Sequence, residues 1–115
     1  MIQKSSCKII INKSKFFGYL FEINYLEEIK KIIEKVSNKN KKICHICYGI
    51  YFNKEEIFKN DGEVGKPGKI LLNILKNKKL NKHVLIVSRI YGGTKLGPAG
   101  VGKVFRKCGE KCLLH

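Results

Sequence analysis

The chain has 115 residues, of which 43% are hydrophobic and 29% are charged, an ordinary globular composition. This length predicts one domain over residues 1–115 and excludes an enzyme with a separate cofactor domain. No apolar stretch approaches the ~20 residues that span a bilayer, and the N-terminus lacks the pattern of a secretory signal. The sequence therefore predicts a cytoplasmic protein without membrane contact.

The chain is strongly basic, with 24 Lys and Arg against 9 Asp and Glu and a net charge of +15. Only Arg89 and Arg106 are arginine, so lysine dominates the surface. Lysine favours loose, salt-sensitive attraction to polyanions such as RNA over base-specific recognition. The abundance of Lys, Ile and Asn is also what an A/T-rich genome would produce, and the sequence leaves both explanations open.

Hydrophobic patterning predicts an α+β domain of about four strands, with helices packed on one face of the sheet. Residues 53–68 are expected to form a long irregular loop, and such loops are usually functional or mobile. The strand over 84–87 is a continuous apolar run and is expected to be buried on both faces. The other expected elements are strands over 8–12, 15–23 and 43–52, and helices over 25–36, 70–77 and 101–112.

Five cysteines form two close pairs and one single residue, an odd number that argues against a disulfide framework. A zinc site would draw on Cys44, Cys47, Cys108 and Cys112, with His45 or His115 as spare ligands. Cys44 and Cys47 fall on an expected strand, where residues three apart point to opposite faces. We therefore expect no metal site and no cofactor.

A thiol–imidazole pair is the second chemical possibility in this strand, because His45 and Cys47 share one face. Such a pair needs an oxyanion-stabilising group and an orienting carboxylate to act as a nucleophile. The sequence offers neither beside it, so a packed thiol next to a hydrogen-bonded histidine is the favoured interpretation.

The glycine-rich segment after the buried strand matches the first seven positions of a phosphate-binding loop at Gly97–Lys103. Val104 follows and has no hydroxyl for magnesium, so nucleotide hydrolysis is not expected. Bare backbone N–H groups before a helix still favour an anion, which predicts contact with an RNA phosphate. The alternative is that the glycines only supply positive φ in a tight turn. The predicted phosphate-binding set is Arg89, Gly92, Gly93, Lys95, Gly97, Lys103 and Arg106.

Several motifs in fixed order resemble the N-terminal domain of the IMPACT family over nearly the whole chain. They are His45-x-Cys47, Asp61-Gly62-Glu63, Gly68-x-x-Leu71-Leu72 and Arg89-x-Tyr91-Gly92-Gly93-x-Lys95-Leu96-Gly97. The chain departs from the family pattern at Ile90 and over residues 64–67. The resemblance implies a fold similar to the second domain of ribosomal protein S5 and a single-domain version of the archaeal type.

The resemblance also implies a role in translation, since the eukaryotic member is a translational regulator and related domains contact RNA or the ribosome. We expect a non-enzymatic domain that binds RNA or a ribosome-associated component. The alternatives are a protein-interaction module and a small-molecule enzyme that uses His45, Asp61 and Glu63. The oligomeric state stays open. The segments near Asp61 and Gly93 are expected to converge in a cationic cleft, whose family-motif residues are His45, Asp61, Gly62, Glu63 and Tyr91.

Overall fold

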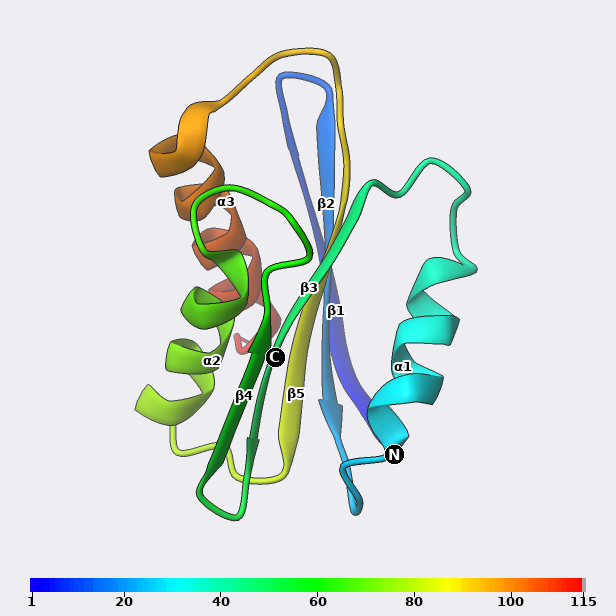
Figure 1. Cartoon of the computed structure of the whole chain (residues 1–115), viewed down its shortest axis with the longest axis vertical. Coiled ribbons are helices and arrows are strands. Elements are labelled where there is room, and N and C mark those ends of the chain that lie inside the picture. The colour runs from blue at the N-terminus through cyan, green and yellow to red at the C-terminus, as the bar shows by residue number, and fades with distance from the viewer. Residues whose placement is uncertain (115) are drawn as a thin grey trace.

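The computed structural model describes residues 1–114 and contains five strands and three helices (Figure 1). Their order is β1 (Ile2–Ile11), β2 (Ser14–Glu22), α1 (Glu28–Ser37), β3 (His45–Phe52), β4 (Glu55–Lys59), α2 (Pro67–Asn77), β5 (His83–Ile90) and α3 (Gly97–Cys112). None of the helices in the described part is long and apolar enough to cross a membrane.

All five strands pair antiparallel in the order β1-β2-β5-β3-β4. The apolar run of β5 therefore lies at the centre of the sheet, and its burial on both faces confirms the prediction for residues 84–87. In the register of the sheet, Arg89 of β5 lies between Phe16 of β2 and His45 of β3. This register places a buried arginine where the candidate site begins.

Residues 55–59, which were expected to belong to an irregular loop, form the fifth strand of the sheet. Asn53 and Lys54 both have positive φ, 48° and 72°, as required in the two-residue turn that closes a twisted hairpin. The resulting β4 pairs with β3 and forms one edge of the sheet. The sequence does not predict this strand, because only Ile57 is partly buried and apolar and polar residues do not alternate.

The α+β class is confirmed, while the helices cover both faces of the sheet rather than one. Helices α2 and α3 lie on one side and α1 on the other (Figure 1). The side chains of β2 alternate between the two faces of the sheet. Phe16 packs in the core beneath α2 and α3, while Phe21 packs against α1 on the other face. A strand with large apolar side chains on both faces needs cover on both.

The helices that flank the candidate site begin earlier than their apolar residues predict. Helix α2 starts at Pro67 and α3 starts at Gly97, with Pro98 in its first turn. Proline favours the first helical positions because its missing N–H has no acceptor there in any case. Residues 97–103 are therefore helical, and only 91–96 form the connection after β5.

Candidate functional site

A recess of about 570 Å³ opens where the loop after β4, the end of β5 and the start of α3 meet. In Figure 1 the loop between β4 and α2 runs beside the beginning of α3. Segments near Glu63 and Lys95, remote in sequence, thus border one volume. The residues that line this recess are Cys44, His45, Glu63, Val64, Arg89, Tyr91, Lys95, Leu96, Gly97, Pro98 and Val101.

A tight turn brings the loop after β4 to the recess. Asp61 and Gly62 have φ of 53° and 72°, and the Glu63 N–H donates to the Asn60 carbonyl at 2.9 Å. The Asp61 carboxylate accepts the Ile46 N–H at 2.7 Å, which fixes the turn to the start of β3. Asp61 and Gly62 therefore shape the loop and do not line the recess.

Glu63 and Arg89 form a buried ion pair at the base of the recess. Arg89 Nη1 donates to Glu63 Oε2 at 3.0 Å. The Arg89 side chain is 6% exposed and the Glu63 side chain is 5% exposed. His45 Nε2 lies 3.7 Å from the same carboxylate oxygen, and its Nδ1 lies 2.9 Å from the Asp61 carbonyl. Of the three residues considered for acid–base catalysis, only His45 and Glu63 line the recess.

Two aromatic rings lie near the Arg89 guanidinium of this pair. Its Cζ lies 5.2 Å from the ring centroid of Phe16 and 5.6 Å from that of Tyr91. Arg89 was predicted to contact phosphate, but its charge is neutralised by Glu63 and its side chain is buried. In this structure its guanidinium contacts Glu63 and the ring of Tyr91.

The predicted glycines take different roles. The Gly92 N–H donates to Ser14 Oγ at 3.0 Å, and a Cβ on Gly92 would lie 2.2 Å from the Lys13 carbonyl carbon. This glycine lets the chain cross the β1–β2 turn closely. Gly93 and Gly97 have φ of 94° and 74° with open space around them, so backbone conformation accounts for both. Gly97 alone among the three lines the recess.

The predicted cations divide between two neighbouring hollows. Lys95 lines the recess, while Lys103 and Arg106 line a second hollow of about 540 Å³ together with Lys66. Both hollows are bordered by Pro98. Within residues 1–114 none of these four cations takes part in an ion pair. We call Lys66, Lys95, Lys103 and Arg106 the cationic rim.

Sequence reasoning missed several residues of this surface, notably Val64, Leu96 and Lys66. The available signal was Gly65, whose φ is 84° and whose added Cβ would lie 2.5 Å from the Pro98 carbonyl oxygen. Only a glycine allows the loop to approach the first turn of α3 so closely. That approach sets the loop against Pro98, which borders both hollows, but the contact cannot be seen without the fold.

The thiol–imidazole pair does not form a nucleophilic site. Cys47 is buried and its Sγ donates to the Asn60 carbonyl at 3.2 Å. Burial raises the pKa of the Cys47 thiol, and the charges of Glu63 and Asp61 raise it further. A thiol that resists ionisation is a packing residue, as the sequence favoured.

No group of three or more potential ligands in residues 1–114 has the arrangement of a metal site. Cys44 is exposed and precedes β3, whereas Cys47 is buried within that strand. His115, considered as a spare ligand, lies outside the described residues.

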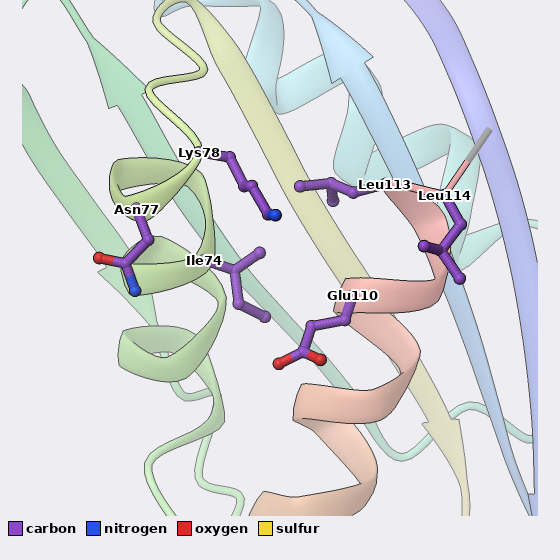
Figure 2. A pocket seen from close by; sticks show the side chains of 6 residues that line it. All are labelled: Ile74, Asn77, Lys78, Glu110, Leu113 and Leu114. Atoms are coloured by element: carbon purple, nitrogen blue, oxygen red, sulfur yellow. The ribbon is translucent and has the colours of Figure 1, made fainter.

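A further cavity of about 330 Å³ lies between the last turns of α2 and α3. Figure 2 shows the side chains of Lys78 and Glu110 extending into the gap between the helices, with Ile74 between them. Its other lining residues are Asn77, Leu113 and Leu114. None of the predicted site residues is among them, so the recess is the cavity that unites the family motifs.

The family model described as the Impact N-terminal domain matches residues 12–113. The chain belongs to this family. The match includes the motifs around Glu63 and Arg89 that meet at the recess, and it confirms the resemblance found in the sequence.

Curated relatives extend the match to bacteria and animals. An IMPACT family member of Bacillus subtilis, YvyE, is 26% identical over 112 residues, which cover 94% of this chain and 52% of the relative. One from Haemophilus influenzae is 30% identical, with 83% and 49% covered, and rat Protein IMPACT is 30% identical, with 75% and 29% covered. The chain thus spans about half the length of the bacterial relatives, or less for the rat protein.

Two solved structures share the fold. A crystal structure of a hypothetical protein has a TM-score of 0.88 at 26% identity, covering 97% of this chain and 58% of the other. The two-domain translational regulator Yih1 has a TM-score of 0.58 at 18% identity, covering 97% and 46%. At that identity the second likeness establishes the fold alone.

Proposed function

We propose that this domain takes part in the regulation of translation by binding single-stranded RNA across the recess and the cationic rim. The observation on which the proposal rests is a half-exposed tyrosine, Tyr91, in a recess that also carries Lys95 and adjoins a hollow lined by three more exposed cations. Membership of the Impact N-terminal domain family supports it, as does the fold shared with Yih1, a two-domain translational regulator.

The cationic rim supplies the electrostatic part of the proposal. Lys66 comes from the loop before α2, Lys95 from the segment after β5, and Lys103 and Arg106 from α3. Lys103 and Arg106 are three residues apart and so lie on the same face of the helix. Because no carboxylate of the described residues pairs with them, all four are available to phosphates.

Tyr91 and the volume beside it supply the part that reads a base. The Tyr91 side chain is 46% exposed, and single-stranded nucleic acids are commonly bound by stacking bases on such rings. A recess of about 570 Å³ has room for a nucleobase. Val64, Leu96 and Val101 make part of its wall apolar, which suits an unstacked base more than a phosphate.

The buried pair of Glu63 and Arg89 makes the floor of the recess rigid. The contact of the Arg89 guanidinium with the Tyr91 ring would hold Tyr91 in place before any ligand arrives. A preformed site loses less side-chain entropy on binding.

The test is the salt dependence of binding to a fluorescein-labelled 12-nucleotide oligouridine, measured by anisotropy between 50 and 200 mM salt. Neutralising four phosphates of a single strand predicts a slope of log affinity against log salt near −3. Undetectable or salt-independent binding would remove the proposal.

A protein partner is the second candidate, and the apolar wall of the recess favours it. Exposed Val64, which lines the recess, would contact an apolar side chain of such a partner. Capture on the immobilised domain from a nuclease-treated extract separates the two candidates. Retention of a ribosome-associated protein without RNA would favour the second, and loss of all captured material would favour RNA.

An enzymatic role is the third candidate, because His45 and Glu63 share a partly apolar cavity of about 570 Å³. The carboxylate is already engaged by Arg89, which favours a structural role. For the substitution His45→Gln, an oligouridine affinity within about threefold of the wild type would show that RNA binding does not need the imidazole.

A further inference from the structure

Three cysteine sulfurs meet on the face of the sheet covered by α3, far from the recess along that helix. Cys7 lies on β1, and Cys108 and Cys112 lie one turn apart on α3. Cys7 Sγ is 3.4 Å from Cys108 Sγ and 2.7 Å from Cys112 Sγ. We call Cys7, Cys108 and Cys112 the thiol cluster.

A glycine makes the room for this cluster. Gly18 of β2 pairs with Cys7, and a Cβ added to it would lie 2.7, 2.8 and 2.9 Å from the sulfurs of Cys112, Cys7 and Cys108. Any side chain at this position would therefore displace all three thiols. The neighbouring strand thus leaves a space that the sulfurs alone fill.

The spacing of the sulfurs suits bond formation between two of them and not a shared metal ion. A zinc ion about 2.3 Å from each thiolate holds tetrahedral sulfurs about 3.8 Å apart, whereas a disulfide brings them to about 2.05 Å. The distance from Cys7 to Cys112 is 2.7 Å, nearer to the second value, and the described residues hold no metal-site arrangement.

Contacts on both sides of Cys7 hold it against the last turn of α3. The Ser5 hydroxyl donates to the Cys112 carbonyl, and Lys111 Nζ donates to the Lys8 carbonyl at 3.2 Å. These two bonds flank the sulfur contact and limit the separation of β1 from the helix. The short distance is therefore part of how β1 docks.

The three thiols differ in access and in ionisation. Cys7 is partly exposed on β1, while Cys108 and Cys112 are fully buried. Contacts with the Cys108 and Cys112 thiols lower the pKa of Cys7, and its Sγ also lies 3.0 Å from the Cys108 carbonyl oxygen. Cys7 is thus the thiolate that an oxidant in solution meets first.

We propose that Cys7 and Cys112 are a reversible oxidation site, which a peroxide converts to a disulfide that ties β1 to the end of α3. The Cys7 thiolate attacks one peroxide oxygen, the O–O bond breaks, and Cys7 becomes a sulfenic acid as hydroxide leaves. The Cys112 thiol attacks the Cys7 sulfur, forming the S–S bond and breaking the S–O bond, and water leaves with the Cys112 proton. In total two thiols lose two electrons, and hydrogen peroxide becomes two waters once the hydroxide takes up the proton that Cys7 released.

The oxidised chain gains a covalent closure between residues 7 and 112, which spans nearly its whole length. Such a long closed loop restricts the unfolded chain strongly, so oxidation should raise Tm by roughly 10 °C. Thiol reductants reverse the bond. Cys108, 3.4 Å from the Cys7 sulfur, is placed to exchange with it.

The sequence allows a direct test, because trypsin releases each thiol of the cluster on its own short peptide. Cys7 falls in Ser5–Lys8, Cys108 in Cys108–Lys111, and Cys112 in Cys112–His115. The native protein is treated with one equivalent of hydrogen peroxide, its free thiols are alkylated, and the digest is analysed by mass spectrometry. We expect Ser5–Lys8 linked to Cys112–His115, and an intact chain lighter by about 2 Da.

Cys44→Ser is the matched control, since exposed Cys44 lies outside the cluster and its loss should leave the link intact. Cys112→Ala should abolish the link and the rise in Tm. Should Cys112→Ala fail to fold, the linkage map and the Tm of the wild type decide the question alone. Five alkylated thiols after peroxide, a link to another cysteine, or zinc held by the purified protein would each overturn the proposal.

Discussion

The two ends of helix α3 differ in how closely the neighbouring segments pack. At its beginning, loops and strand ends stand apart and enclose the recess, with charges fixed by the pair of Glu63 and Arg89. At its end, Gly18 lets β1 and β2 approach so closely that sulfurs touch. Open volume with fixed charges suits reversible binding of a ligand, whereas contact between soft atoms suits covalent chemistry. Position in the fold therefore decides what each end can do.

The largest effect is expected at the recess end, from Arg89→Met. The change leaves the Glu63 carboxylate buried without its partner, which costs about 3–5 kcal/mol of unfolding free energy. Urea denaturation followed by circular dichroism measures it.

The double variant Arg89→Met/Glu63→Leu is the control for that prediction. A well-packed apolar pair often replaces a buried ion pair at little cost, and Arg89 Nε has no acceptor among the described residues. We expect the double variant to lie within about 1 kcal/mol of the wild type. A single variant as stable as the double would show that the pair does not anchor the recess.

At the cluster end, the lowered pKa of Cys7 predicts alkylation that depends little on pH. Lowering the pH from 8 to 6 reduces the thiolate fraction of an ordinary thiol roughly 100-fold. Cys7, whose pKa is lowered by its contacts with the Cys108 and Cys112 thiols, should keep more of its thiolate over this range than an ordinary thiol does. Iodoacetamide labelling of peptide 5–8, with free cysteine as the reference, checks this. A fall equal to that of free cysteine would contradict the hydrogen-bonded thiolate.

Glycine-to-alanine changes near the two ends of α3 should act in opposite directions. Gly18→Ala overfills the thiol cluster and should cost about 1–3 kcal/mol. Gly100→Ala places a Cβ 3.4 Å from the Leu96 Cβ, an ordinary contact, and should stabilise the helix by about 0.5–1 kcal/mol. Thermal denaturation of both variants measures the difference. Equal changes in Tm would mean that the cluster is no tighter than the start of the helix.

An effect smaller than that of Arg89→Met is expected for Tyr91→Ala in RNA binding. Loss of one stacking ring should weaken oligouridine affinity roughly 5- to 30-fold while leaving the salt slope unchanged. The exposed Tyr25, which lies before α1, provides the matched control. Anisotropy titrations that show equal losses for Tyr91→Ala and Tyr25→Ala would exclude stacking at the recess.

The sequence predicts the elements whose burial follows a simple period. The continuous run of β5 and the three-and-four spacing in α1 are visible because each side chain packs in the direction its period implies. The edge strand β4 is invisible because one face meets solvent and only Ile57 packs. The cover of the second face by α1 needed knowledge of which face of β2 each aromatic ring occupies.

The candidate site was predictable as a set of motifs, but not as an arrangement. Family motifs named Glu63, Arg89 and Tyr91, and the structure places all three at the recess. That Arg89 is neutralised while Lys66 is available depends on side-chain distances that no spacing encodes. The sequence does not predict the thiol cluster either, because Cys7 and Cys112 lie at opposite ends of the chain and only the fold brings their sulfurs together.

The most direct test of the account compares two triple variants that remove equal charge. Lys95→Ala/Lys103→Ala/Arg106→Ala strips the cationic rim, and Lys30→Ala/Lys31→Ala/Lys41→Ala strips exposed lysines in and after α1, on the other side of the sheet. For the rim variant we predict an oligouridine salt slope smaller in magnitude by about 2, and for the α1 variant a slope close to that of the wild type. An equal reduction of the salt slope in the two variants would contradict the assignment of RNA to the recess. It would mean that the net charge of the protein alone drives the binding.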